Sequence, residues 1–214
     1  MPGYYPVLLD LKDKRCVVIG GGKVAERKVT SLVRAKAIVT VVSPELTKSL
    51  QQMAEKKKIH YINGCFKERH LDGAYLVIGA VGNSEINYHV FKAATKKNKL
   101  VNTVDSPDKC NFIVPSIIKQ GDLMISISTG GKSPALAKKI RQQLENQFGK
   151  AYKDFLPFMG ELRQRIMAQF PDTKYRNKIF QALVDSELLD LFKKGLKKKA
   201  EKKAEEIINR FSKN

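Results

Sequence analysis

Short apolar runs rich in β-branched residues alternate with segments of helical periodicity over the first half of the chain. Such runs are typical of strands that are buried on both faces of a sheet. They lie at residues 15–20, 37–43, 59–62, 74–81 and 100–105. Residues 25–33 carry apolar side chains at helical spacing, and residues 44–57 form a second helical segment with Pro44 near its start. The alternation predicts a parallel sheet whose strands are joined by right-handed helical crossovers.

The pattern changes after the fifth run. Residues 112–119 and 122–128 are two strand-like runs on either side of a Gln120-Gly121 turn signal, which predicts an antiparallel hairpin. Beyond the hairpin the apolar spacing is helical to the end of the chain. The apolar positions of these predicted helices are Leu136, Ile140, Leu144, Phe148, Phe155, Met159, Leu162, Ile166, Leu183, Leu188 and Phe192. The second half of the chain is therefore expected to be a hairpin followed by helices.

These patterns define the expected fold class and domain organisation. The class is α/β, with a Rossmann-like, doubly wound parallel sheet at residues 1–112. A small α+β segment of hairpin plus helix follows at 113–148, and a helical C-terminal domain follows at 149–214. The Lys-rich stretch 195–206 has only a narrow apolar line and is interpreted as a helix with a solvated face, with polyanion contact as the alternative.

Composition narrows the class of protein further. The 214 residues include 40 Lys and Arg against 21 Asp and Glu, a formal net charge of +19, which favours anionic partners. No apolar run approaches the roughly 18 residues that span a bilayer, and the N-terminus lacks a basic lead-in, so we expect a cytoplasmic protein with no membrane partner. Cys16, Cys65 and Cys110 show no pairing pattern and the three His no ligand spacing. Neither a disulfide framework nor a metal site is expected.

A glycine-rich loop follows the first predicted strand. Residues 20–25 read GGGKVA, which matches the pattern G-x-G-x-x-A at the start of a helix. In this setting Gly20 permits a tight turn, Gly22 lets the backbone approach a pyrophosphate, and Ala25 allows close packing of helix on sheet. The N-terminus of the helix favours the negative charge of the phosphates. The loop therefore predicts a dinucleotide site.

The choice between NAD and NADP depends on the end of the second strand. The carboxylate that usually reads the ribose is replaced by Ser43, although Glu45 lies two residues further on. No Arg stands beside it to favour a 2′-phosphate. We therefore favour NAD.

A second loop, residues 128–133 with the sequence STGGKS, precedes a predicted helix. It is not a Walker loop, because that pattern requires glycine where the chain has Ser126. With Ser133 as N-cap and Pro134 as first helical residue, the loop is expected to present free N–H groups, two hydroxyls and a lysine to a carboxylate or a phosphate. A purely structural helix cap is an equal alternative.

Asp105 ends the fifth predicted strand. Because the carboxyl ends of parallel strands face the ligand crevice of a doubly wound sheet, Asp105 is a candidate acid or base. A hydrogen-bonded aspartate that starts a turn before Ser106-Pro107 is the competing interpretation.

Three segments of the chain resemble the precorrin-2 dehydrogenase family, which forms the N-terminal part of siroheme synthases. The segments are YYPVLLDLKDKRCVVIGGGKVAERKV, VNTVDSPDKCNFIVPSII and LMISISTGGKSPALAKKIRQQLE, in family order within residues 4–148. The resemblance implies an enzyme that oxidises precorrin-2 to sirohydrochlorin with NAD, and a homodimer formed through the segment after the nucleotide domain. Some members of the family also insert ferrous iron, and the sequence leaves this activity open.

The resemblance also implies roles for individual residues. Asp105 would be the essential carboxylate. NAD would be held by Gly20, Gly21, Gly22, Lys23, Val24, Ser43, Pro44 and Glu45. The eight carboxylates of the tetrapyrrole substrate would make sense of an anion-binding loop formed by Ser128, Thr129, Gly130, Gly131 and Lys132. No residue is assigned to a resident metal.

Two other functions use the same features. A regulatory domain that senses NAD would need the glycine loop without any chemistry. A nucleic-acid-binding protein would use the positive charge, but the tyrosines lie mostly within strand or helix patterns and form no RNA-binding motif, so no nucleic-acid partner is expected.

Overall fold

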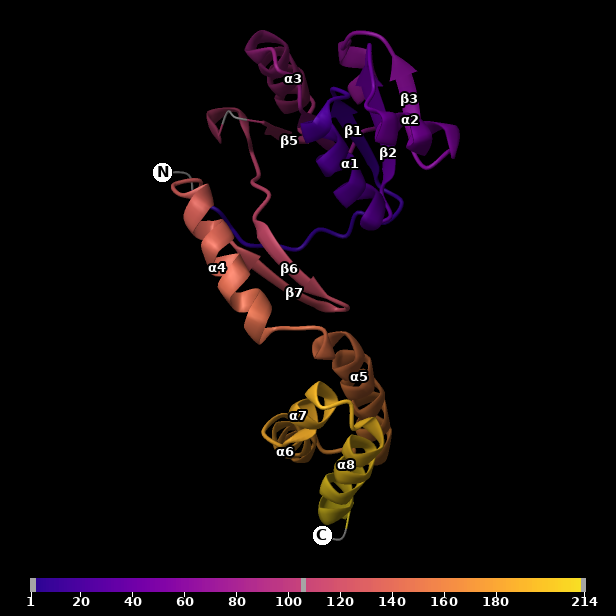
Figure 1. The fold of residues 1–214 in the computed structure, drawn as a ribbon, viewed down its shortest axis with the longest axis vertical. Helices are drawn as coiled ribbons and strands as arrows, with labels where there is room; N and C mark the ends of the chain where they lie inside the picture. The colour runs from indigo at the N-terminus through magenta and orange to yellow at the C-terminus, as the bar shows by residue number, and fades with distance from the viewer. Residues whose placement is uncertain (1–2, 105–106, 213–214) are drawn as a thin grey trace. The chain divides into compact units, whose positions relative to one another are not determined.

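The computed structural model describes residues 3–104 and 107–212 and divides into two compact units, Met1–Val114 and Pro115–Asn214 (Figure 1). The first unit contains a five-stranded parallel sheet in the order β3-β2-β1-β4-β5. Its strands are β1 (Arg15–Ile19), β2 (Ile38–Ser43), β3 (His60–Asn63), β4 (Leu76–Gly79) and β5 (Leu100–Thr103). This order reverses direction between β1 and β4, so the predicted doubly wound sheet is confirmed.

Helices cover both faces of this sheet. They are α1 (Lys23–Arg34), α2 (Lys48–Glu55) and α3 (Ser84–Lys96), with short 3-10 helices η1 (Glu68–Leu71) and η2 (Pro107–Lys109). Successive strand residues point to opposite faces, so Val18 packs with Val29 of α1 while Val17 packs with Val90 of α3, and all four are fully buried. This two-sided burial explains why the strands are continuous apolar runs rather than alternating ones.

Several predicted boundaries in the first unit are wrong. Strand β4 covers Leu76–Gly79 and not residues 74–81. Helix α2 begins at Lys48 and not near Pro44, because the Thr47 hydroxyl caps it by accepting the N–H of Leu50 at 3.3 Å. Strand β5 ends at Thr103, two residues before Asp105, which lies outside the described residues.

The second unit begins with the predicted hairpin and its helix. Strands β6 (Ser116–Gln120) and β7 (Leu123–Ile127) are antiparallel, and α4 (Pro134–Gln147) follows them. Gln120 pairs with Leu123, so the turn is Gly121-Asp122, one residue later than predicted. Gly121 has a φ of +62°, and a Cβ there would lie 2.9 Å from the Cα of Lys153, so this turn requires glycine.

The rest of the second unit is helical, as predicted. Its helices are α5 (Ala151–Gln169), α6 (Thr173–Val184), α7 (Leu188–Lys193) and α8 (Lys197–Ser212). They enclose a core that includes Ile166, Ile179 and Leu183. Ala200 and Ala204 of the Lys-rich stretch are fully buried in this core, while all its lysines except the half-buried Lys203 are exposed, which agrees with the predicted solvated helix face. Within the part of the chain that the structure describes, no helix has the length and apolarity that a membrane crossing requires.

A bidentate ion pair joins α5 to α8. The guanidinium of Arg165 donates to the two carboxylate oxygens of Glu205 at 2.6 and 3.0 Å. These hydrogen bonds hold the pKa of Glu205 below its usual value. A carboxylate with a lowered folded-state pKa stabilises the fold above its unfolded pKa, and the contribution is lost as the pH falls through the folded-state pKa.

We therefore expect Glu205→Gln to lower the free energy of unfolding at pH 7 by about 0.5 kcal/mol, since both side chains are partly exposed. Urea unfolding at pH 7 and at pH 3 measures the effect, which should be smaller at the lower pH. Glu201→Gln, at an exposed position of the same helix, is the control. An equal loss at both pH values would contradict the assignment to the ion pair.

Candidate dinucleotide site

The glycine loop lies where the strand order of the sheet reverses, at the carboxyl ends of β1 and β4. The N–H of Gly20 donates to the Val42 carbonyl of β2 at 2.9 Å, and Ile19, the residue before the loop, accepts the N–H of Ala80 after β4 at 2.8 Å. Ligands of doubly wound sheets bind at this reversal point. The structure therefore places the predicted loop where a dinucleotide is expected.

The first two glycines of the loop are required by the fold itself. Gly20 has a φ of +116°, and a Cβ there would lie 2.4 Å from the carbonyl oxygen of Ala80. A Cβ on Gly21 would lie 1.9 Å from the carbonyl oxygen of Glu45. Any side chain at either position would collide with the main chain of a neighbouring segment.

Gly22 differs from both. It has an ordinary φ of −80°, it is exposed, and a Cβ there would meet no atom of the described residues within 4 Å. The fold therefore gives no reason for glycine at this position. A ligand that approaches the backbone closely supplies one.

The segment Ser43–Thr47 forms the second wall of the site. The N–H of Thr47 donates to the Gly21 carbonyl at 2.9 Å, and the Thr47 hydroxyl donates to Glu26 of α1 at 2.6 Å. Ser43 is buried, whereas Pro44 and Glu45 are exposed beside the loop. The structure thus brings together all the residues predicted for NAD: Gly20, Gly21, Gly22, Lys23, Val24, Ser43, Pro44 and Glu45.

The start of α1 fits an anionic group. Gly22 is its N-cap residue and no side chain of the described residues caps it, in contrast to α2, α3 and α4, which Thr47, Asn83 and Ser133 cap. First-turn N–H groups without a protein partner at an exposed glycine suit a phosphate. These residues therefore fit the pyrophosphate of a dinucleotide.

A buried asparagine that the sequence analysis missed shapes the end of β4. The side chain of Asn87 donates to the Val81 carbonyl at 2.8 Å, and a Cβ on Gly79 would lie 2.9 Å from its Oδ1. Asn87 is only 4% exposed, so it fixes the loop from Ala80 to Asn83 from within. The available signal was a polar residue at a core-facing position of a helical pattern.

A set of side-chain hydrogen bonds closes the segment that follows β5. The Thr103 hydroxyl donates to the Lys109 carbonyl at 2.7 Å, Asn102 forms a β-bridge with Cys110, and the side chain of Asn111 accepts the N–H of Val101 at 2.8 Å. We refer to Asn102, Thr103, Cys110 and Asn111 as the β5 clasp. It joins the chain on the two sides of Asp105, which itself lies outside the described residues.

The STGGKS loop is a helix cap with internal hydrogen bonds. Ser133 caps α4 by accepting the N–H of Leu136 at 3.2 Å, and Pro134 is the first helical residue, as predicted. The expectation of free N–H groups is wrong for three residues, because Ser128 and Thr129 accept them within the loop. These donors are Gly130, Lys132 and Ser133, each at 3.1 Å from its acceptor. An exposed lysine, Lys132, is what the loop offers to an anion.

Burial shifts the pKa of several groups in the first unit. It raises the pKa of the Cys16 thiol to about 11, which excludes Cys16 as a thiolate nucleophile at neutral pH. Burial, followed by the neighbouring charge of Arg27, lowers the pKa of Lys28 on α1. The Nδ1 of the buried His70 accepts the N–H of Lys67 at 3.1 Å and has a local structural role. No group of three metal-ligating side chains occurs among residues 3–104 and 107–212.

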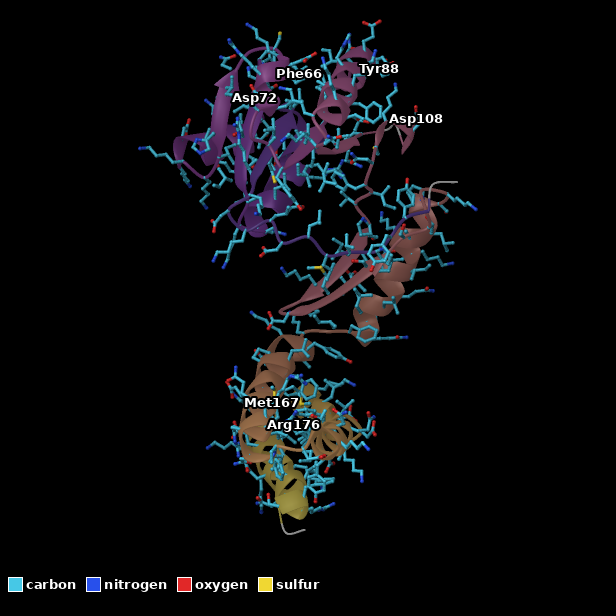
Figure 2. All side chains as sticks on the ribbon, turned by 180° about the vertical axis from the view of Figure 1, so that it is seen from behind. Phe66, Asp72, Tyr88, Asp108, Met167 and Arg176 are labelled. Carbon is cyan, nitrogen blue, oxygen red and sulfur yellow. The ribbon has the colours of Figure 1, made fainter. Side chains whose placement is uncertain are left out.

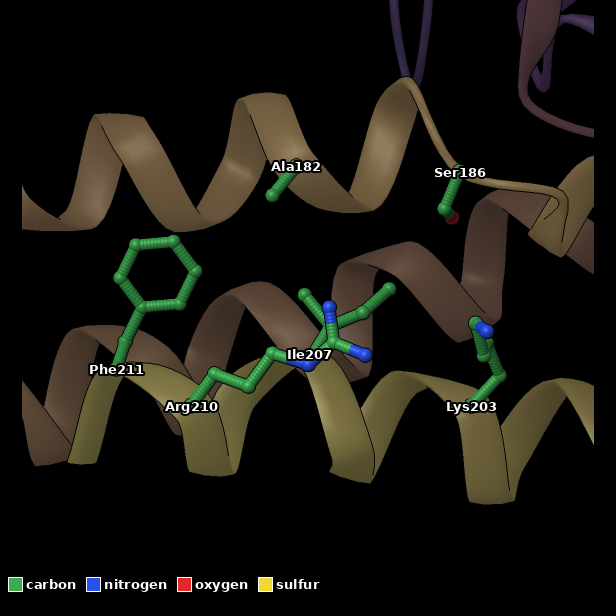
Figure 3. Close-up of a pocket in the computed structure, with 6 residues that line it drawn as sticks. All are labelled: Ala182, Ser186, Lys203, Ile207, Arg210 and Phe211. Atoms are coloured by element: carbon green, nitrogen blue, oxygen red, sulfur yellow. The ribbon is translucent and has the colours of Figure 1, made fainter. Parts of the chain in front are cut away.

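The second unit contains a cavity of about 370 Å³ (Figure 3). It is lined by residues of α6 and α8 and by Ser186 between α6 and α7, and none of these residues belongs to the predicted dinucleotide site. The lining residues are Ala182, Ser186, Lys203, Ile207, Arg210 and Phe211. The ammonium of Lys203 lies 3.4 Å from Glu187, so part of its charge is already neutralised.

Three family models match consecutive parts of the chain. A model described as NAD(P)-binding covers residues 7–116, one described as sirohaem biosynthesis protein central covers 120–147, and one described as sirohaem synthase dimerisation region covers 151–208. The chain belongs to the siroheme synthase family. Its glycine loop and its sheet both lie within the NAD(P)-binding part of this family.

Similar proteins agree with this membership. The chain is 35% identical to a siroheme synthase of Thioalkalivibrio sulfidiphilus over 205 residues and 37% identical to one of Methylobacillus flagellatus over 188 residues. These matches cover 96% and 86% of this chain but 42% and 40% of those proteins, so it spans less than half their length. A solved structure of SirC, a precorrin-2 dehydrogenase, shares the fold with a TM-score of 0.79 at 24% identity, over 99% of this chain and 100% of that one.

The contrast between the three glycines generates a test of the dinucleotide site. We expect Gly22→Val to fold normally and to lose NAD affinity by about 100-fold or more, equivalent to about 2.8 kcal/mol, because the new side chain fills only the space of the ligand. Calorimetric titration with NAD and thermal unfolding measure the two properties.

Gly21→Ala, in contrast, should lower the unfolding temperature, because its Cβ would collide with the Glu45 backbone. Gly149→Val is the matched control, because its Cβ also meets no described atom but lies in the second unit. NAD affinity of Gly22→Val equal to that of the parent would remove the glycine loop as the cofactor site.

Proposed function

We propose that this protein oxidises precorrin-2 to sirohydrochlorin with NAD as hydride acceptor. The observation that carries the proposal is Gly22, which is exposed at the uncapped start of α1 and has no conformational reason to be glycine, in a chain of the siroheme synthase family. A regulatory domain that only senses NAD would share this site, and turnover distinguishes the two functions.

The residues of the first unit would bind and orient the cofactor. The backbone of Gly20–Val24 would hold the pyrophosphate, and Ser43, Pro44 and Glu45 would border the ribose beyond it. We keep NAD over NADP, because Glu45 is the exposed charge at this turn and a carboxylate disfavours a 2′-phosphate. When bound, NAD supplies the acceptor for a hydride that leaves a ring carbon of the substrate.

Asp105 is the proposed catalytic carboxylate. The oxidation releases a proton together with the hydride, so the site needs a base and a well-positioned acceptor. Asp105 lies in the segment between Thr103 and Lys109 that the β5 clasp closes, and this segment follows β5, the edge strand beside β4. This proposal for Asp105 rests on the position of that segment and on the family resemblance.

The substrate would be recognised through its carboxylates. The STGGKS loop would contribute the ammonium of Lys132. The hydroxyls of Ser128 and Thr129, whose oxygens accept N–H groups within the loop, would donate their hydrogens to a carboxylate, and Gly130 and Gly131 would shape the turn. The net charge of +19 favours association with such a polyanion. Ferrous iron is retained as a second substrate to be tested in the same assay, once sirohydrochlorin has formed.

We further propose a homodimer. Apolar side chains are exposed on the hairpin and on α4, with Ile117, Met124 and Leu136 between 39% and 48% exposed. We predict that the segment 113–148 forms the contact between the two copies. The family model described as a dimerisation region instead covers residues 151–208, where Val184 is 62% exposed. The free thiols of Cys16 and Cys65 are consistent with a cytoplasmic location.

The direct test of the function is anaerobic incubation of the purified protein with precorrin-2 and NAD, with sirohydrochlorin followed by absorbance. We expect turnover by the parent and a rate about 100-fold to 10,000-fold lower for Asp105→Asn, because the change removes the base. Asp108→Asn, at the exposed aspartate of η2, is the control. Tight NAD binding without turnover would favour the sensing domain, and a rate of Asp105→Asn within threefold of the parent would remove Asp105 from the mechanism.

The dimer contact is tested by light scattering at micromolar concentration. We expect a dimer for the parent, a shift toward monomer for Ile117→Lys, and no shift for Val184→Lys, because a buried lysine at the contact costs its hydration. The reverse result would move the contact to 151–208. A fully active monomeric parent would contradict the dimer altogether.

A further inference from the structure

Two lysines from different elements gather at one exposed tyrosine ring in the first unit. The ammonium groups of Lys92 on α3 and Lys109 on η2 each lie 5.4 Å from the centre of the Tyr88 ring. Figure 2 shows Tyr88 on α3 beside the short helix that carries Asp108. We refer to Tyr88, Lys92 and Lys109 as the tyrosine–lysine cluster.

Within the described part of the chain, no carboxylate pairs with the two lysines of this cluster. Among residues 3–104 and 107–212, neither Lys92 nor Lys109 has a carboxylate oxygen within 4.0 Å, whereas Lys97 at the end of the same helix pairs with Asp72. The ring of His89 lies 6.3 Å from that of Tyr88. The ring attracts both cations but leaves their charge available to an anion.

The cluster also lies at the functional edge of the sheet. Helix α3 begins just after β4 and η2 just after β5, so both leave the sheet at the carboxyl ends of its strands. The glycine loop and the Ser43–Glu45 turn occupy the β1 and β2 side of this edge. The β4 and β5 side is therefore the part of the edge left for the molecule that reacts with the dinucleotide.

The support under the cluster is rigid. The Lys109 carbonyl accepts the hydroxyl of Thr103, which is 3% exposed, and the neighbouring Cys110 pairs with Asn102 of β5. Tyr88 directly follows the buried Asn87 in a regular helix. A ligand would thus meet groups held by the core rather than by a free loop.

We propose that the tyrosine–lysine cluster binds a flat, polyanionic ring: the macrocycle lies against Tyr88, and its carboxylates pair with Lys92 and Lys109. This inference rests on the proposed function, to which it adds the residues of the nucleotide-binding unit that hold the substrate. Two ammonium groups over one exposed aromatic ring match an apolar ring that carries several acidic arms.

Titration with uroporphyrin, a porphyrin with eight carboxylates, and coproporphyrin, which has four, tests the cluster without turnover. We expect Lys92→Ala/Lys109→Ala to weaken uroporphyrin binding about tenfold, as two partly exposed ion pairs should, and to affect coproporphyrin less. Tyr88→Leu should weaken both porphyrins about threefold, because the ring face is lost. NAD affinity and the unfolding temperature should be unchanged in all variants.

A matched pair of residues at the opposite edge of the same sheet provides the control. Tyr75, just before β4, is 40% exposed against 42% for Tyr88, and the Lys14 ammonium lies 5.8 Å from its ring. Tyr75→Leu and Lys14→Ala should bind uroporphyrin as the parent does. Equal losses at both pairs, or affinities of the cluster variants within twofold of the parent, would overturn the proposal.

Kinetics with precorrin-2 separate this inference from the proposed function. If the parent turns over precorrin-2, Lys92→Ala/Lys109→Ala should raise its KM about tenfold with kcat within threefold of the parent. An unchanged KM would overturn the cluster and leave the dehydrogenase intact. A parent without turnover, combined with loss of uroporphyrin binding in the variant, would overturn the dehydrogenase and leave the cluster as a polyanion site.

Discussion

The close approach of three backbone segments is the constraint on which the first unit depends. Gly20 lies against the main chain of Ala80, and Gly21 lies against that of Glu45, at distances that leave no room for a Cβ. These contacts draw the ends of β1, β2 and β4 together at the reversal point of the sheet. They also leave Gly22 exposed at the uncapped start of α1. The same close approach therefore holds the strand ends together and leaves the backbone of Gly22 accessible to a ligand.

Positive charge serves different purposes in the two units. Ala200 and Ala204 of α8 pack into the helical core, while most lysines of this helix are exposed to solvent. Arg165 forms an ion pair with Glu205. In the first unit, Lys92 and Lys109 gather at Tyr88 without a protein carboxylate among the described residues. The two ammonium groups at this ring suit the carboxylates of the proposed substrate.

The sequence predicts features that repeat or that require one residue type. The β-branched runs indicate the strands because both faces of the sheet are buried, and the three glycines locate the loop. Boundaries fail where one hydrogen bond decides them: the Thr47 cap moves the start of α2 away from Pro44. Residue propensity and apolar periodicity do not predict which side chain caps a helix, and so they do not fix its first residue.

The polar contacts behind the site are harder still to predict. Asn87 and the β5 clasp act through partners up to twelve residues away, and only the folded chain shows that Thr103 reaches Lys109 or that Asn102 meets Cys110. The STGGKS loop illustrates the same limit, since its hydroxyls take up N–H groups that the sequence leaves open to a ligand. Tyr88 is unremarkable in sequence because its two lysines come from different elements.

Hydrogen–deuterium exchange with and without NAD tests the central claim most directly, because it reads the backbone amides of the two walls separately. The account predicts that NAD slows exchange at residues 22–25 and 45–47 together, with little change in α5–α8. Slower exchange in only one of the two walls would contradict a single dinucleotide site. So would protection confined to residues 128–133.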